Sequence, residues 1–243
     1  MVKTLNRGNF VRGIVLAFSL IALPGCMAVM PQIQGSGVSK TESRSVPEFS
    51  EIDASHAVRL TVSIGTPTSV EVTTDDNLLP HVLTEVSGKR LKIRMDAGTT
   101  TKLGVNVKVV TPTLTELRGS GATDITATGV EANEFELKLN GASRCQLSSR
   151  TEKLQVDLSG ASQATLSGTT ARLKAEASGA SHLKAAELQA RVAKVDASGA
   201  SNVDVEVTEE LTAKANGASN VFYVGSPAVV RKHESGASHV GPK

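Results

Sequence analysis

Apolar and polar residues alternate through the second half of this 243-residue chain in a pattern that returns every 18 to 20 residues. Each repeat contains the tetrapeptide [Ser/Asn]-Gly-Ala-[Ser/Thr]. Its copies begin at Ser120, Asn140, Ser159, Ser178, Ser198, Asn216 and Ser235. A fixed short period over this length is typical of a solenoid, in which stacked neighbours share one core.

Aligned on the glycine, the repeats place apolar residues in four columns. Two columns follow the tetrapeptide and two precede it, with a polar residue between the members of each pair. This alternation predicts two short strands per repeat, joined at a glycine corner. The columns after the corner are Ile125, Cys145, Ala164, Leu183, Val203, Val221, Val240 and Ala127, Leu147, Leu166, Ala185, Val205, Tyr223; those before it are Leu117, Leu137, Val156, Ala175, Val195, Ala213 and Leu139, Leu158, Ala177, Ala197, Ala215.

The corner residues suit a tight turn that is stacked many times. Glycine has no Cβ, so it can take a positive φ or let neighbouring corners approach closely. The flanking Ser and Asn side chains can hydrogen-bond local backbone. A leucine-rich repeat has a similar period, but its Leu-x-x-Leu-x-Leu framework is missing. We therefore predict an all-β fold: a parallel β-helix with rungs of about 19 residues, right-handed by the chirality of parallel connections.

One β-helical domain is predicted over residues 47–243, with a β-rich lead-in at 47–112 and the repeat array at 113–243. The lead-in has no period of its own, but alternating apolar residues indicate several strands, and an antiparallel insertion is expected to pack on the first coil. The apolar stretch 78–86 favours a single helical turn. Residues 52–56, Ile-Asp-Ala-Ser-His, resemble the later repeats without their glycine.

The N-terminus predicts a targeting segment. A basic head precedes an apolar run, Gly13–Leu23, that is too short to span a bilayer as a helix. The run ends in Leu23-Pro24-Gly25-Cys26, which resembles a bacterial lipobox except at Pro24, where a small residue such as Ala or Ser is usual. We predict a lipoprotein signal peptide over 1–25, lipidation of Cys26 and a flexible tether over 26–46. The alternative is an ordinary signal peptide cut nearby, with Cys26 incidental.

Localisation and charge follow from this cleavage. Met27, and not an Asp, follows the cysteine, so we expect a lipid anchor in the outer membrane. Removing Lys3, Arg7 and Arg12 with the signal leaves 23 of the 26 basic residues against 24 acidic ones. The mature chain is near neutral, and the sequence therefore predicts no nucleic-acid partner.

Several of these features together resemble one bacterial family. The period, the Ser-Gly-Ala-Ser corners, the lead-in Phe49…Ile52…Ser55 and the closing stretch Val221–Pro227 are similar to the putative auto-transporter adhesin, head GIN domain family, found in lipoproteins and secreted proteins of Gram-negative bacteria. The resemblance covers roughly residues 48–240. It implies a β-helical fold and surface binding, and it supplies no catalytic residues.

The first candidate for chemistry is a polar column two residues before each corner: Lys138, Asp157, Glu176, Asp196 and Lys214. Carboxylates on successive rungs lie about 5 Å apart, a spacing that suits Ca²⁺ binding or a paired-carboxylate glycosidase. The simpler interpretation is a solvated face whose repulsion is offset by Lys174 and Lys194. We predict no metal and no cofactor.

A second polar column follows each corner: Asp124, Arg144, Gln163, His182, Asn202, Asn220 and His239. His182 and His239 are three rungs apart, about 14 Å, so they cannot share a metal. The candidate binding surface predicted from both columns is His182, Asn202, Asn220, Asp157, Glu176 and Asp196. Cys145 falls in an apolar column and is predicted to be a buried structural cysteine.

Three hypotheses of function result. The first is a lipid-anchored envelope protein with a non-catalytic binding or adhesion role towards a glycan or protein ligand. The second is a carbohydrate-active β-helix enzyme, a lyase or hydrolase, that uses the acidic column. Its sequence support is weak, because sugar clefts favour aromatic platforms and the mature chain keeps only Phe49, Phe135, Phe222 and Tyr223. The third is a periplasmic scaffold with end-to-end self-association, since no capping helix follows the last repeat.

Overall fold

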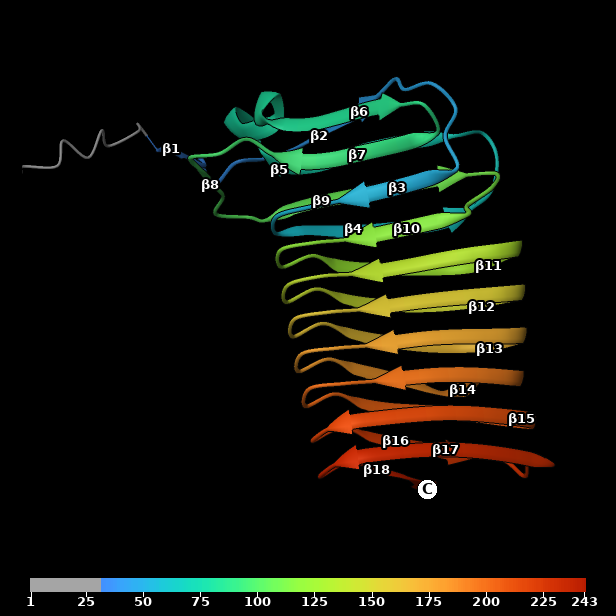
Figure 1. Cartoon of the computed structure of the whole chain (residues 1–243). Coiled ribbons are helices and arrows are strands. Elements are labelled where there is room, and N and C mark those ends of the chain that lie inside the picture. The colour runs from blue at the N-terminus through green and yellow to red at the C-terminus, as the bar shows by residue number, and fades with distance from the viewer. Residues whose placement is uncertain (1–31) are drawn as a thin grey trace, which may run out of the picture. The chain divides into compact units, whose positions relative to one another are not determined.

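The computed structural model describes residues 32–243, and most of them form one stack of β-coils (Figure 1). The predicted parallel β-solenoid is confirmed. One long strand follows each of the first glycine corners, and each pairs in parallel with the next: β11 (Asp124–Leu139), β12 (Arg144–Leu158), β13 (Gln163–Ala177), β14 (His182–Ala197) and β15 (Asn202–Gly217). The stack ends in β16 (Asn220–Val224), β17 (Val229–Gly236) and β18 (His239–Pro242).

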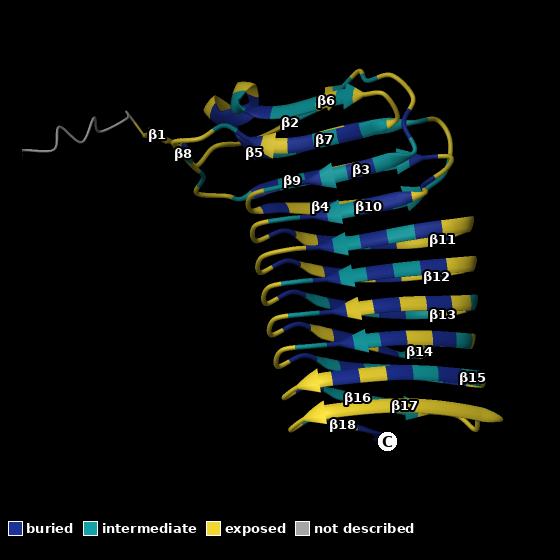
Figure 2. Ribbon diagram, in the orientation of Figure 1, coloured by how far each residue is buried: buried dark blue, intermediate teal, exposed yellow. Residues whose placement is uncertain are grey.

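The core fills the inside of the coil with the four predicted apolar columns. Every member of the columns is buried except Tyr223, which is half-buried against the same core. Buried and exposed residues alternate along β11–β15 (Figure 2). Because residues of one column lie in register on successive strands, each apolar side chain stacks on its own kind above and below. Cys145 belongs to this core, as predicted, and burial raises the pKa of its thiol to about 12.

The strands of the array are longer than the sequence pattern predicts. Two short strands per repeat were expected, but β11–β15 are each 15 or 16 residues long and run through a second bend opposite the glycine corner. The bend is marked by register shifts, such as those after Ala127 and Thr165. A bulge of this kind turns a strand while pairing continues on both sides of it. No residue type repeats there strongly enough to reveal the bend in the sequence.

The glycine corner is held by stacking of backbone on backbone. All seven corner glycines have φ between 73° and 78°. The amide of the following Ala donates to the carbonyl of the glycine one coil earlier, as in Ala180 N–H to Gly160 O at 2.8 Å. A Cβ placed on Gly179 would lie 2.6 Å from that same oxygen. Both reasons proposed from the sequence, positive φ and close approach, therefore apply at once.

At five of the seven corners a serine hydroxyl closes the turn from inside, whereas the Thr123 and Ser181 hydroxyls have no partner among the described residues. Ser201 Oγ donates to Ser198 O at 2.9 Å and to Ala177 O at 3.2 Å on the preceding coil, and it is fully buried. Ser219 Oγ makes the equivalent pair of bonds to Asn216 O and Ala197 O. The bond to Ser198 O satisfies a carbonyl of the turn, whereas Ala177 O already accepts the amide of Ser198 and gains a second donor. The predicted local hydrogen bonding of the corner is confirmed.

The first coil uses a histidine where the later coils use glycine. His56 has φ of 71°, and its carbonyl accepts the amide of Ala122 at 3.0 Å, as a corner glycine does. Its coil consists of β3 (Glu51–Ala54) and β4 (Val58–Ile64), which pair in parallel with β10 (Glu116–Gly119) and with the start of β11. Residues 52–56 therefore form a corner of the same kind as the corners of the later repeats.

The lead-in completes the N-terminal end of the stack. β7 (Arg90–Met95) and β9 (Val105–Thr111) pair in parallel with β3 and β4. Antiparallel strands β5 (Ser69–Asp75) and β6 (Val82–Ser87) extend these sheets, as the predicted insertion requires. A helical turn was expected over 78–86. The 3₁₀ helix η1 (Asp76–His81) supplies it in the first part, but residues 82–86 belong to strand β6, so the second part of the prediction is wrong. Two short strands, β1 (Ile33–Gln34) and β8 (Thr99–Thr100), pair with each other.

The predicted tether over 26–46 is wrong in its second part. Residues 39–44 form β2 (Ser39–Arg44), which pairs antiparallel with β5 along its whole length. The strand was missed because its residues, Ser-Lys-Thr-Glu-Ser-Arg, are all polar and none is buried. Backbone hydrogen bonds to an edge strand hold it, and these leave no hydrophobic period in the sequence.

The signal peptide at 1–25, Cys26 and the first residues of the tether lie outside the described residues and stay predictions. Within residues 32–243, no helix has the length and apolar character needed to cross a membrane.

The buried carboxylate of Asp75 ties together the loops at the N-terminal end. Its Oδ1 accepts the amide of Gly37 at 2.6 Å, and its Oδ2 accepts the Thr101 hydroxyl at 2.6 Å and the amide of Lys102 at 3.1 Å. The hydrogen bond from Thr101, aided by these backbone bonds, lowers the pKa of Asp75 from 3.8 to about 2 and outweighs the opposing effect of burial.

Replacing a corner glycine should destabilise the protein more than replacing a glycine with the same φ elsewhere. Gly179→Ala adds a left-handed strain of about 1–2 kcal/mol and a collision with the Gly160 carbonyl. Gly129 has φ of 71° but open space around its Cβ position, so Gly129→Ala adds the strain alone. Guanidinium unfolding should show Gly179→Ala to be the less stable variant by about 2 kcal/mol or more. Equal losses would contradict the stacking account.

The Asp75 contacts should make stability depend on pH in acid. A carboxylate whose pKa is lowered on folding stabilises the protein above its unfolded pKa of about 3.8, and this contribution is lost as the pH falls towards 2. Asp75→Asn should lower the melting temperature at neutral pH, and its difference from wild type should shrink between pH 4 and pH 2. A difference that stays constant over this range would show that ionisation of Asp75 has no part in stability.

Candidate functional site

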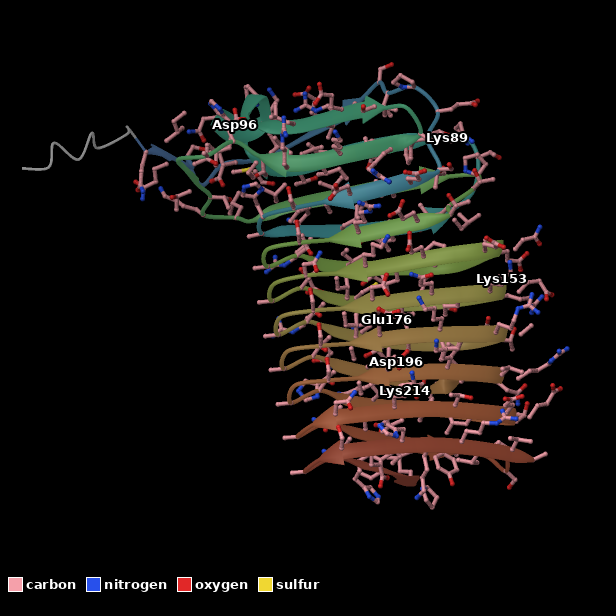
Figure 3. The ribbon with its side chains drawn as sticks, viewed as in Figure 1. Lys89, Asp96, Lys153, Glu176, Asp196 and Lys214 are labelled. Carbon is pink, nitrogen blue, oxygen red and sulfur yellow. The ribbon has the colours of Figure 1, made fainter. Side chains whose placement is uncertain are left out.

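The acidic column predicted from the sequence exists. Lys138, Asp157, Glu176, Asp196 and Lys214 occupy one register position on β11–β15. None of them is buried, and Figure 3 shows Glu176, Asp196 and Lys214 following one another along the stacked strands. Neighbours in such a column are about 4.8 Å apart at the backbone.

A second column runs beside it, two residues earlier on each strand. It carries the opposite charge on β11, β13 and β14, and is neutral on β12 and β15. Where the acidic column carries Glu176 and Asp196, the second column carries Lys174 and Lys194. Lys174 Nζ lies 2.8 Å from Glu176 Oε1, and this hydrogen bond and charge raise the pKa of the lysine. The predicted role of Lys174 in offsetting the acidic column is confirmed.

On the earlier coils the two columns exchange signs. Glu136 lies in the second column and binds Lys138 Nζ at 2.7 Å. Glu116 lies one coil earlier and contacts Arg90 at 2.7 Å and also Arg118. Burial would raise the pKa of Glu116, but hydrogen bonds from Arg118 and Arg90 outweigh it and lower the pKa below its usual value. The face is thus a ladder of ion pairs.

A small pocket opens beside the acidic column. It has a volume of about 270 Å³. The Oδ2 atom of Asp157 accepts a hydrogen bond from Gln155 Nε2 at 3.1 Å, while its Oδ1 is buried and has no partner among the described residues. The pocket is surrounded by hydroxyl, amide, ammonium and carboxylate groups. Its lining residues are Lys138, Asn140, Asp157, Leu158, Ser159, Glu176 and Ser178.

A larger groove crosses the same face over successive coils, from β3 to β14. It has a volume of about 830 Å³. Phe135, Leu154 and Leu173 contribute backbone to its floor, because their side chains are buried in the core. The side chains around it are charged and separated by sign. Its other lining residues are Glu51, Thr115, Glu116, Glu134 and Glu136 towards the N-terminal end, and Lys153, Gln155, Arg172, Lys174, Val192 and Lys194 towards the C-terminal end.

The groove and the small pocket share a wall. Gln155 lines the groove and Asp157 lines the pocket, and the two side chains are hydrogen-bonded. Lys174 and Glu176 are related in the same way and form an ion pair. One ligand that extends along the strands can therefore contact both.

Sequence reasoning missed the groove. It placed Asp157 and Glu176 correctly, but it treated Lys174 and Lys194 only as counter-charges, and it did not consider Lys153 and Arg172. These two lie in register on β12 and β13, four residues before the acidic column. Aligning that position across the repeats was enough to find the cations, whereas the hollow itself leaves no pattern in the sequence.

The column after the corner is a separate surface. His182, Asn202 and Asn220 stack in register, as predicted. Asn220 Nδ2 donates to Asn202 Oδ1 at 3.0 Å, and Asn202 Nδ2 lies 3.4 Å from His182 Nδ1. These three side chains hydrogen-bond to one another, and none of them lines the groove or the small pocket. The six predicted surface residues are thus divided between the two sides of the corner.

Within residues 32–243, no three His, Cys, Asp or Glu side chains are grouped to hold a metal ion. The groups on this face can form hydrogen bonds to hydroxyl groups at the small pocket and can pair with anions at the cationic end of the groove.

Comparison with known proteins agrees with this architecture. The model of the family described as putative auto-transporter adhesin, head GIN domain, matches residues 48–227. No curated protein matches the chain.

Three crystal structures share the fold at low sequence identity. A putative adhesin from Bacteroides fragilis NCTC 9343 superposes with a TM-score of 0.82 at 21% identity, over 87% of this chain and 100% of that one. A putative adhesin from Parabacteroides distasonis ATCC 8503 gives 0.73 at 22% identity, over 87% and 100%. A putative lipid binding protein from the same organism gives 0.71 at 20% identity, over 87% and 99%.

Proposed function

We propose that this chain, which belongs to the putative auto-transporter adhesin, head GIN domain family, is a non-catalytic binding protein of the cell envelope, anchored in the outer membrane by a lipid on Cys26. The observation that carries the binding role is the groove with its adjoining pocket on the face of β11–β14. Side chains from successive coils converge there and present charges and hydrogen-bonding groups to one extended ligand.

The arrangement of the carboxylates favours binding over catalysis. A glycosidase needs one carboxyl group kept protonated and a second one free to act as nucleophile or base. In the small pocket, Gln155 binds Asp157 and Lys174 binds Glu176. Both carboxylates already have a partner in the protein, which suits a fixed hydrogen-bonding surface.

The anchor follows from the N-terminal sequence. Leu23-Pro24-Gly25-Cys26 places a cysteine at the end of a short apolar run, and Met27 in the next position supports transfer to the outer membrane. Six residues separate Cys26 from β1 (Ile33–Gln34), the first strand, and a fully extended segment of that length spans about 20 Å. That distance lets the β-helix clear the lipid headgroups.

A relative described as a putative lipid binding protein raises the question of an apolar ligand. In this chain the large exposed hydrophobic residues lie away from the groove and the small pocket: they are Ile33, Val38, Leu103, Val224, Val229 and Val230. We therefore propose a polar ligand, a glycan or a protein segment.

The anchor and the location are tested together in cells. Wild-type protein should sediment with the outer membrane, and Cys26→Ser should be released in soluble form. Protease added to intact cells should digest the wild-type chain as it does after lysis, if the protein acts on other surfaces. Membrane retention of Cys26→Ser would contradict the lipid anchor. Protection until lysis would confine the protein to the periplasm and contradict an adhesion role.

End-to-end self-association is a second proposal, favoured by β17. Within residues 32–243 this strand pairs only with β15, and all eight of its residues are exposed (Figure 2). An unpaired strand edge can join a second copy, and two-fold symmetry would pair the two edges antiparallel. Sedimentation should show a dimer that dissociates on dilution and is weakened by Val230→Pro, which removes an amide from the ladder. A monomer at all concentrations would contradict the proposal.

A further inference from the structure

We propose that the groove binds an anionic polysaccharide and that the acidic group of one sugar is held by Arg172, Lys174 and Lys194. This inference rests on the proposed binding function and specifies its ligand class.

The charge balance of the groove supports an anion at its C-terminal end. The carboxylates at the other end already have partners: Arg90 contacts Glu51 and Glu116, and Lys138 contacts Glu136. Lys153 binds Glu134, and Lys174 binds Glu176. After these pairs are formed, two cations in the groove have no carboxylate within 4.0 Å among the described residues: Arg172 and Lys194.

The register of the strands gathers these cations around one point. Lys174 lies two residues after Arg172 on β13, and Lys194 is its direct partner on β14. Backbone spacings are therefore about 6.6 Å along the strand and about 4.8 Å between strands. Lys153 adds a fourth positive charge in register with Arg172 on β12. A carboxylate or sulfate placed among these side chains can accept several charge-assisted hydrogen bonds, one of them from the planar guanidinium.

The neighbouring pocket supplies the groups that recognise sugar hydroxyls. Asp157 Oδ1 is buried without a partner, so it can accept a hydrogen bond from a hydroxyl group. Asn140, Ser159 and Ser178 surround the same space with further donors and acceptors. Because the pocket and the groove share a wall, a chain with an acidic group on one sugar and hydroxyls on the next matches both.

An anionic membrane fits this surface less well. A bilayer presents a broad negative plane, whereas the cations here lie in a hollow whose other half is lined by Glu51, Glu116, Glu134 and Glu136. The groove also offers no exposed aromatic ring, since Phe135 is only 2% exposed. Affinity for one sugar unit is therefore expected to come from charge and hydrogen bonds and to be weak, with repeated acidic sugars adding avidity.

The ligand class is tested by calorimetry on the purified protein with four probes. These are oligogalacturonate and dextran sulfate, which carry carboxylates and sulfates, neutral dextran, and vesicles containing phosphatidylglycerol. We expect binding to at least one anionic polysaccharide, weakened by salt because the cations are solvent-accessible, and no binding to dextran or vesicles. Binding to vesicles or dextran without binding to either anionic polysaccharide would overturn the inference and leave the binding function standing.

The site is tested by a pair of double variants that remove equal charge. Arg172→Gln/Lys194→Gln alters the groove. Lys184→Gln/Lys108→Gln alters exposed lysines outside it, and neither has an ion-pair partner among the described residues. The groove variant should bind the anionic probe roughly tenfold more weakly or worse, and the control less than about twofold more weakly. Equal losses in both would show attraction by overall charge and overturn the assignment.

The same samples separate failure of this inference from failure of the proposed function. The probe should keep its chain length after prolonged incubation with the wild-type protein. Shortening of the probe would contradict the non-catalytic function itself, whether or not the groove variant binds. Circular dichroism spectra and melting temperatures of both double variants should match wild type, because all four substituted side chains lie on the outer face of the coil.

Discussion

The stacking of one glycine corner on the next is the constraint on which the rest of this structure depends. Each corner amide donates to the carbonyl of the glycine one coil earlier, and the space between them has no room for a Cβ. A residue with a side chain would push the coils apart at that point. Because the corners cannot slip, every other residue of the repeat is fixed in register with its counterparts on the neighbouring coils.

Because of this register, equivalent residues of successive repeats form columns on the inner and the outer surface of the coil. Inside, it stacks apolar side chains into a continuous core. Outside, it places charges about 4.8 Å apart. Each charged residue therefore interacts with neighbours on its own strand and on the adjacent strands. On the face of β11–β14 the two charged columns carry opposite signs on most coils, and ion pairs such as Lys174–Glu176 result. The face remains highly charged without strong repulsion, and a hollow within it keeps two cations free.

The sequence predicts most of the fold, because the repeat period, the corner glycine and the alternation of apolar and polar residues can all be recognised from the residue types. Even the first corner is detectable, although His56 replaces the glycine there. The features that the sequence does not predict depend on backbone hydrogen bonds and not on a pattern of side chains. β2 is entirely polar, and the second bend of the coil has no repeated residue. The acidic column was found from its spacing. Arg172 and Lys153 were missed because the position four residues before that column was not aligned across the repeats, and the hollow beside them leaves no pattern in the sequence.

The most direct test of the central claim, that this face is where the protein binds, is the reactivity of individual lysines towards an amine reagent. Labelling would be measured by mass spectrometry with and without polysaccharide extracted from the cell envelope. Labelling of Lys153, Lys174 and Lys194 should be slower when the polysaccharide is present, and labelling of Lys184 and Lys108 should be unchanged. Unchanged rates at the three groove lysines, or protection of Lys184 and Lys108 instead, would contradict the central claim.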